Sequence, residues 1–155
     1  MSRVTPTTAK KRIVAQRADY VLQMVSEIRH LPLESQEAFT LDRRNIWAAE
    51  SCLRRALEAL LDLGRHILAK CFAKGVTEYK QIAEELEKEK VLSPEDAKLL
   101  RALAGYRNRM VHFYEEITPV ELYAICSEQM EDLLVIRDAY LNWIKANPDR
   151  VDETL

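Results

Sequence analysis

The sequence predicts an all-α protein, an up-and-down four-helix bundle with one additional short helix. Only 3 of its 155 residues are glycine and 5 are proline, so the chain has few places for a sharp turn. Apolar residues recur every three or four positions over long stretches, which is helical spacing. No segment shows sustained alternation of apolar and polar residues, and no Asn-Gly or Asp-Gly pair marks a β-hairpin. These features favour a few long helices joined by brief loops.

The first two predicted helices are long. One spans about residues 10–28, and its pattern stops at His30-Leu31-Pro32. The other is expected from the candidate N-cap Asp42 to about Phe72, with Gly75 as a natural stop. At 1.5 Å per residue this second helix is roughly 45 Å long, so we expect it to form the spine of the bundle. The apolar face of the first helix consists of Val14, Ala18, Val21, Val25 and Ile28.

Start signals place the remaining helices. Thr77 is expected to cap the short additional helix, which reaches about Lys90. Ser93-Pro94-Glu95-Asp96 combines a Ser N-cap, Pro at the first helical position and acids in the first turn. Thr118-Pro119-Val120-Glu121 is a second such signal, with a capping-box Glu three residues after Thr. The last helix is predicted to run from there to about Ala146.

Length and composition are those of one folded domain. A single helical domain is predicted for residues 1–155, with a core of about 10–146 and loose tails at 1–8 and 148–155. Hydrophobic residues make up 48% and charged residues 31%, the balance of a globular protein. A formal net charge of −2 argues against a chain coated with cations for wrapping nucleic acid, but it leaves room for a local basic site.

The sequence carries no signal for a membrane, a metal or a cofactor. No run of about 18 apolar residues exists, so no transmembrane helix or membrane partner is expected. The first residues lack the apolar core of a signal peptide, which makes the cytoplasm the expected location. Cys52, Cys71 and Cys126 share no short metal-ligand spacing, and we expect them to be small buried side chains.

The segment from Tyr106 to Tyr114 is the candidate functional site. Arg107 and His112 lie near the end of the predicted fourth helix, five positions or roughly 140° apart on an ideal helix. They would meet across a cleft, or if the helix loosens at its end. Arginine offers a planar fork of donors to phosphate and histidine titrates near neutral pH, so the pair suits phosphodiester chemistry. The alternative is that Arg107 and Arg109 are solvated cations at a helix end, with His112 as a C-terminal partner.

The pattern Arg107-Asn108, three residues, His112, one residue, Tyr114 resembles the signature of the HEPN superfamily, and more narrowly that of the HepT-like toxins. The similarity extends over about residues 10–146. It includes the long helix through Ala48–Ile67 and the lead into the motif at Leu103-Ala104-Gly105-Tyr106. Phe113 stands where the family often has Gly, and this would narrow the space beside His112.

The resemblance implies a metal-independent endoribonuclease without a cofactor, which works as a homodimer whose two motifs face each other. His112 would act as general base or acid in attack of the ribose 2′-hydroxyl on the adjacent phosphorus. Arg107 would stabilise charge on the phosphoryl oxygens, and Asn108 would orient His112 or the phosphate. DNA lacks the 2′-hydroxyl, so RNA is the expected substrate and DNA is not.

The resemblance also implies a partner. HepT-like toxins are paired with a minimal nucleotidyltransferase antitoxin that adds AMP to the motif tyrosine, which here is Tyr114. AMP at that position would block the site sterically and electrostatically. Two alternatives stay open: a non-catalytic HEPN subunit that binds nucleotide or RNA and partners a nucleotidyltransferase, and a plain helical interaction module.

Overall fold

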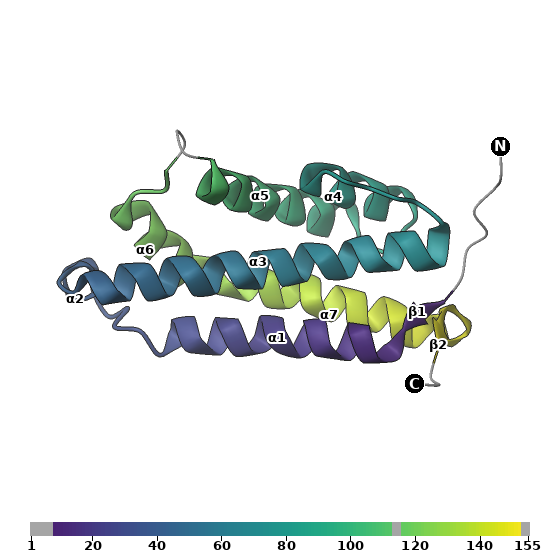
Figure 1. Cartoon of the computed structure of the whole chain (residues 1–155), viewed down its shortest axis with the longest axis horizontal. Helices are drawn as coiled ribbons and strands as arrows, with labels where there is room; N and C mark the ends of the chain where they lie inside the picture. The colour runs from purple at the N-terminus through teal and green to yellow at the C-terminus, as the bar shows by residue number, and fades with distance from the viewer. Residues whose placement is uncertain (1–7, 113–115, 153–155) are drawn as a thin grey trace.

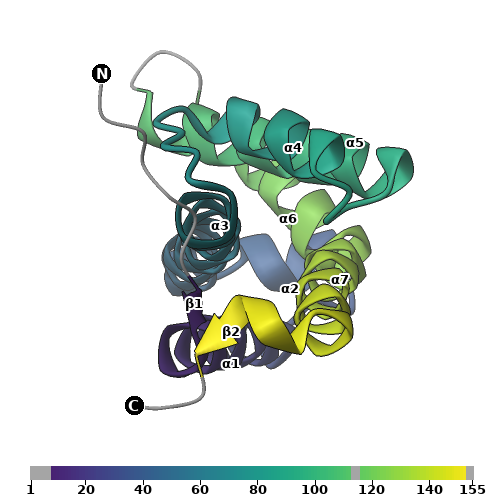
Figure 2. The ribbon, with the colours of Figure 1, turned by 90° about the vertical axis from the view of Figure 1, so that its right-hand side faces the viewer.

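The computed structural model describes residues 8–112 and 116–152. Most of these residues are helical, so the predicted all-α class is confirmed. Three long helices run side by side, and two more lie over the central one (Figures 1 and 2). In the described ranges the helices are α1 (Lys11–Arg29), α2 (Gln36–Thr40), α3 (Arg43–Phe72), α4 (Tyr79–Lys88), α5 (Pro94–Val111), α6 (Pro119–Glu128) and α7 (Met130–Ala146).

The 30-residue helix α3 is the spine, as predicted. α1 and α7 lie along it and α4 and α5 cover another side (Figure 2), and α2 and α6 also contact it. Asp42 is its N-cap and accepts a hydrogen bond from Arg44 N at 2.9 Å. Ala73, rather than Gly75, takes the left-handed conformation that ends the helix, with φ of 54°.

The last predicted helix is broken, so its continuity was a wrong expectation. Thr118 caps α6 as predicted and accepts from Glu121 N at 3.2 Å. Gln129 then leaves helical geometry, with ψ of 6°, and α7 begins at the next residue. The side-chain amide of Gln129 donates to Tyr106 Oη at 3.0 Å, and this hydrogen bond connects the break to α5. The break lets α6 pack on α2 and α3 while α7 follows α1.

One local expectation is wrong, and one short helix has no counterpart in the sequence prediction. The N-cap of α4 is Glu78, not Thr77, and it makes no side-chain capping bond. α2 was not predicted: Ser35 caps it by accepting from Ala38 N at 3.0 Å, and its Phe39 is fully buried.

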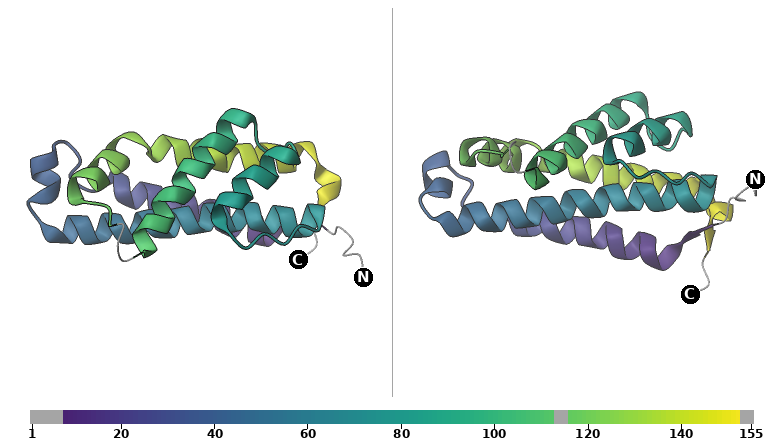
Figure 3. Two further views of the ribbon diagram at one scale, coloured as in Figure 1. Left: turned by 90° about the horizontal axis from the view of Figure 1, so that it is seen from above. Right: turned by 45° about the horizontal axis from the view of Figure 1, so that its top comes forward.

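Figure 3 shows α4 and α5 crossing α3 obliquely rather than running parallel to it.

After α7, residues 148–152 form two further short elements, in the part of the chain where we expected a loose tail. A 3-10 turn, η1 (Pro148–Arg150), leads into strand β2 (Val151–Asp152), which pairs in parallel with β1 (Ala9–Lys10). Lys10 N also donates to His66 Nε2 of α3 at 3.1 Å, and burial lowers the pKa of His66. Both ends of the described chain are therefore fastened at one end of α3.

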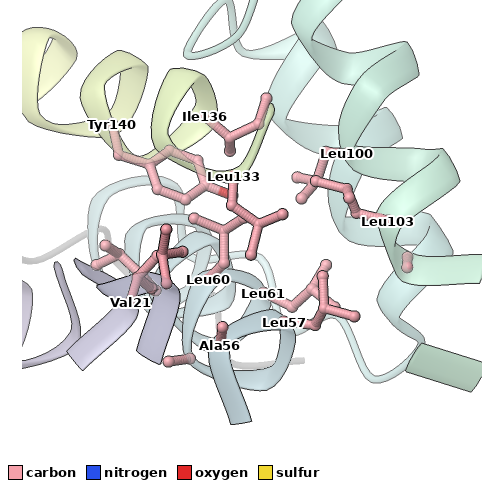
Figure 4. Close-up of a cluster of buried hydrophobic side chains, with 14 of the residues drawn as sticks. Val21, Ala56, Leu57, Leu60, Leu61, Leu100, Leu103, Leu133, Ile136 and Tyr140 are labelled. Carbon is pink, nitrogen blue, oxygen red and sulfur yellow. The ribbon is translucent and has the colours of Figure 1, made fainter. Parts of the chain in front are cut away.

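The core is one continuous cluster of apolar side chains. Figure 4 shows leucines of α3 facing two other groups, which are Leu133, Ile136 and Tyr140 of α7 and Leu100 and Leu103 of α5. Cysteines 71 and 126 are buried and Cys52 is half-buried, and no group of side chains in the described ranges could hold a metal ion. No helix in the described part of the chain is long and apolar enough to cross a membrane.

Gly64 sets the closest approach of α7 and α4 to the spine. A Cβ atom at this position would lie 2.6 Å from Tyr140 Oη and 2.9 Å from Leu86 Cδ1. Tyr140 is fully buried, and its hydroxyl has no hydrogen-bond partner in the described structure. The absence of a side chain at Gly64 is therefore a packing requirement.

We predict that Gly64→Ala lowers the free energy of unfolding by about 1–3 kcal/mol, because the added methyl overpacks the core. Urea unfolding followed by circular dichroism measures this. Tyr140→Phe removes the nearest atom and an unpaired buried hydroxyl, so it should be neutral or stabilising alone and should restore part of the loss in Gly64→Ala. Equal stability of wild type and Gly64→Ala would contradict the packing argument.

Candidate functional site

The candidate residues lie where α5 ends. Ser93 caps the helix as predicted, accepting from Asp96 N at 3.1 Å, so the register of α5 is set at its start. At the other end His112 is the C-cap: its backbone is extended, with φ of −92° and ψ of 121°, and its N–H donates to Asn108 O at 3.1 Å. The helix therefore ends at His112. Because the backbone of His112 is not helical, the angle of an ideal helix does not set the direction of its side chain relative to that of Arg107.

One open pocket of about 440 Å³ joins the three candidates Arg107, Asn108 and His112. Its other walls are Arg65 of α3 and the residues that lead into α4. The pocket therefore contains the three residues expected from the sequence, together with several residues that were not expected there. The added lining residues are Arg65, Thr77, Glu78, Tyr79 and Lys80.

Arg107 is held by two neighbours. Its Nε lies 3.7 Å from Glu58 Oε1, and its guanidinium carbon lies 4.6 Å from the centroid of the Tyr79 ring. The side chain is 25% exposed, and Nε is buried without a hydrogen-bond partner. Among the described residues, nothing accepts a hydrogen bond from the terminal nitrogens of Arg107. Its donors are therefore available to an anion such as a phosphate oxygen.

Tyr79 and Arg65 form a fixed wall of the pocket. The Tyr79 hydroxyl donates to Asp62 Oδ1 at 3.0 Å. Burial raises the pKa of Tyr79, and the negative charge of Asp62 raises it further. Arg65 donates to the carbonyl oxygens of Val76 at 3.0 Å and Thr77 at 2.9 Å, and its guanidinium carbon is 4.8 Å from the Tyr79 ring centroid. Arg65 is thus committed to the loop between α3 and α4.

Arg109 makes different contacts from those of Arg107. Its two terminal nitrogens donate to Glu121 at 2.6 and 2.7 Å, a bidentate ion pair between α5 and α6. Hydrogen bonding to Arg109 lowers the pKa of Glu121. The alternative of a merely solvated cation is wrong for Arg109. The pair instead holds together the two helices that flank the segment after His112.

His112 is exposed and lies on the rim of a second hollow of about 300 Å³. No hydrogen bond or ion pair within the described ranges orients its imidazole ring. Tyr114, the candidate AMP acceptor, and Phe113 lie outside the described residues. The second hollow is lined by Glu50, Met110, Val111, His112, Glu116, Ile117 and Pro119.

Exposed apolar side chains lie in and near this second hollow: Val111 lines it, Val120 follows its lining residue Pro119, and Trp47 lines a neighbouring hollow. Trp47 is 63% exposed, Val111 46% and Val120 53%. Glu50 lines both the hollow beside His112 and the neighbouring one that Trp47 lines, so the two hollows are adjacent. We call Trp47, Val111 and Val120 the apolar rim. An apolar group of this kind next to polar candidates is typical of an interaction surface.

Comparisons with known proteins bear on the family and the fold of the chain. The model of the family described as Ribonuclease HepT-like matches residues 21–139. The chain is also similar to a protein named tRNA nuclease HepT from Aphanizomenon flos-aquae, with 35% identity over 79 residues, 50% of this chain and 53% of that protein. The chain thus spans about half the length of the curated relative it matches.

Solved structures share the fold. A tri-AMPylated HEPN toxin of Shewanella oneidensis, in complex with an MNT antitoxin, superposes with a TM-score of 0.75 at 19% identity, covering 86% of this chain and 97% of that one. The Bacillus subtilis protein YutE, a cytosolic protein of unknown function, gives a TM-score of 0.73 at 16% identity, covering 88% and 92%. At such identities the likeness establishes the fold alone.

Proposed function

This chain belongs to the HepT-like ribonuclease family of HEPN proteins, and on that premise we propose that it is the toxin of a toxin–antitoxin pair and a metal-independent endoribonuclease. The observation that carries the proposal is the single pocket that joins Arg107, Asn108 and His112. Arg107, whose terminal nitrogens have no acceptor among the described residues, and the exposed His112 line the same pocket, and an arginine beside an imidazole supports cleavage of a phosphodiester.

The chemistry follows from these groups. His112 takes the proton from the ribose 2′-hydroxyl as its oxygen attacks the adjacent phosphorus, or donates a proton to the departing 5′-oxygen. Arg107 stabilises the negative charge that grows on the phosphoryl oxygens, and Asn108 orients the phosphate or the imidazole. The side chains themselves supply acid–base and charge stabilisation, so no metal ion is needed. Transfer RNA is the first substrate to test, because one similar protein is named as a tRNA nuclease.

We also propose that the chain is a homodimer joined through the apolar rim. One chain offers a single His112 without an orienting contact in the described residues, beside a site that is open to solvent. A two-fold axis through this surface would bring two copies of the motif together and cover the exposed Trp47, Val111 and Val120. Both the incomplete site and the exposed apolar area support this arrangement.

We predict that Arg107→Ala and His112→Ala each lower the rate of tRNA cleavage in EDTA by about 10²–10⁴, with unchanged circular dichroism. Arg101→Ala is the matched control, because Arg101 is exposed on the same helix but does not line the pocket. Equal cleavage by wild type and His112→Ala would sink the nuclease assignment. Tight RNA binding by a wild type that cleaves nothing would instead favour the non-catalytic HEPN subunit.

We predict a dimer of the 18.0-kDa chain in sedimentation equilibrium at micromolar concentration. Trp47→Lys places a charge in the apolar rim and should give monomers that cleave RNA poorly although Arg107 and His112 are intact. Leu22→Lys is the control, since Leu22 is 45% exposed but lies on α1, on the far side of α3 from α5 (Figure 2). A monomeric wild type would rule out the dimer.

We propose that the antitoxin controls the chain by modifying Tyr114. Co-expression with the cognate nucleotidyltransferase should add one or more AMP groups at Tyr114, and the similar Shewanella toxin is described as tri-AMPylated. The negative phosphodiester would compete with RNA for Arg107. Intact mass and peptide mapping measure the modification. Tyr114→Phe should arrest growth like wild type and escape neutralisation by modification. An unmodified Tyr114 in a neutralised toxin would assign control to complex formation.

A further inference from the structure

We propose that Tyr79 is a positioning residue for Arg107: its ring, with the Glu58 carboxylate, holds the guanidinium at the pocket before substrate arrives. We call the Tyr79 ring and the Glu58 carboxylate around Arg107 the clamp. The expected effect of the clamp on RNA cleavage rests on the proposed function, whereas the clamp itself rests on these contacts alone. Arg107 lies five residues before the motif histidine, but Tyr79 and Glu58 come from two other helices. Sequence spacing within the motif therefore says nothing about either contact.

Tyr79 can act as a clamp because it is itself fixed. It is the first residue of α4, its hydroxyl donates to Asp62 Oδ1 at 3.0 Å, and the ring is half-buried. Arg65 lies against the same ring, at 4.8 Å from the centroid, and contacts the same carboxylate at 3.4 Å. The backbone just before Tyr79 is held by the hydrogen bonds from Arg65 to Val76 O and Thr77 O. Ring, hydroxyl and backbone are thus each restrained.

The contacts restrain Arg107 without using its terminal donors. The Tyr79 ring contacts the guanidinium at 4.6 Å from Cζ, and Glu58 lies 3.7 Å from Nε. Arginine has several rotatable bonds, and a side chain ordered in advance does not lose that freedom when the phosphate binds. Groups fixed before the reaction stabilise developing charge without reorganising. A freely rotating Arg107 would lose this advantage.

The charges around the ring are arranged so that Arg107 stays attractive to an anion. Two arginines share one aromatic ring, and each has its own carboxylate, Asp62 for Arg65 and Glu58 for Arg107. Glu58 is also bound by Arg54 at 3.1 Å, closer than its 3.7 Å contact with Arg107. The positive charge of Arg107 is therefore only partly compensated.

Nuclear magnetic resonance of ¹⁵N-labelled protein tests the clamp without any assay of activity. The Nε–H signal of Arg107, assigned by its loss in Arg107→Lys, should be displaced by the ring and protected from exchange with water. Tyr79→Leu should move this signal to the position of an unstacked arginine and speed its exchange, whereas Tyr79→Phe, which keeps the ring, should leave it close to wild type. An Arg107 signal that Tyr79→Leu does not change would overturn the proposal.

Single-turnover cleavage tests the consequence. Tyr79→Leu should lower the rate about tenfold or more in the wild-type background, and Tyr79→Phe should restore most of it. In Arg107→Ala, measured at high enzyme concentration, Tyr79→Leu should add no further loss, because a residue that acts through Arg107 has nothing left to position. Equal losses in both backgrounds would overturn the inference and leave the nuclease assignment standing.

Tyr123→Leu is the matched control for a structural effect. Tyr123 is also half-buried, its hydroxyl donates to Leu33 O at 3.0 Å and its ring packs on Phe39, but it does not line the pocket. The Tyr123→Leu variant should lose thermal stability as Tyr79→Leu does, but it should keep the wild-type cleavage rate. If both variants lost the same amount of cleavage rate, the effect of Tyr79 would be on the fold, and the proposal would be overturned. A wild type that cleaves no RNA would refute the proposed function, and the magnetic-resonance arm would still decide the clamp.

Discussion

Burial of α3 on most of its circumference connects the core of this protein to its site. The second half of the helix is surrounded, and leucines such as Leu57, Leu60 and Leu61 contact α7 and α5 on different sides (Figure 4). Gly64 lets α7 and α4 approach where a methyl group would collide. Because interiors are close-packed, the rotation of α3 about its axis is fixed, and so is the direction in which its remaining polar residues point.

Those polar residues are the ones that organise the pocket. Arg54, Glu58, Asp62 and Arg65 recur at helical spacing along the one side of α3 that is only partly buried. Glu58 contacts Arg107, while Asp62 and Arg65 hold Tyr79. A helix that serves as the spine of the core therefore also supports Arg107 from behind. Displacement of α3 would therefore disturb both the packing of the core and the position of Arg107.

The end of α5 contributes the second constraint. Helical geometry up to Val111 places Arg107 and Asn108 on the pocket wall, and the extended backbone of His112 brings the imidazole to the same opening. The ion pair between Arg109 and Glu121 fixes α6 relative to this end. Two arginines of one short segment thus have different positions, because Arg107 lines the pocket whereas Arg109 joins α5 to α6. The apolar rim lies directly beside this opening, so dimerisation and catalysis in our proposal depend on the same surface.

The sequence by itself determined the features that depend on neighbouring residues. Helical periodicity gave the all-α class, and side-chain caps at Asp42, Ser93 and Thr118 set three helix starts, because a cap bonds to backbone two or three residues away. The resemblance of the segment from Arg107 to Tyr114 to the HEPN signature indicated the candidate site, because that signature also lies within one short stretch of the chain. The tertiary structure decided the rest: the break at Gln129, the pairing of β1 with β2, and the contacts of Arg107 with Tyr79 and Glu58. These join residues that are distant in the chain, and only the packing of helices on α3 brings them within contact distance.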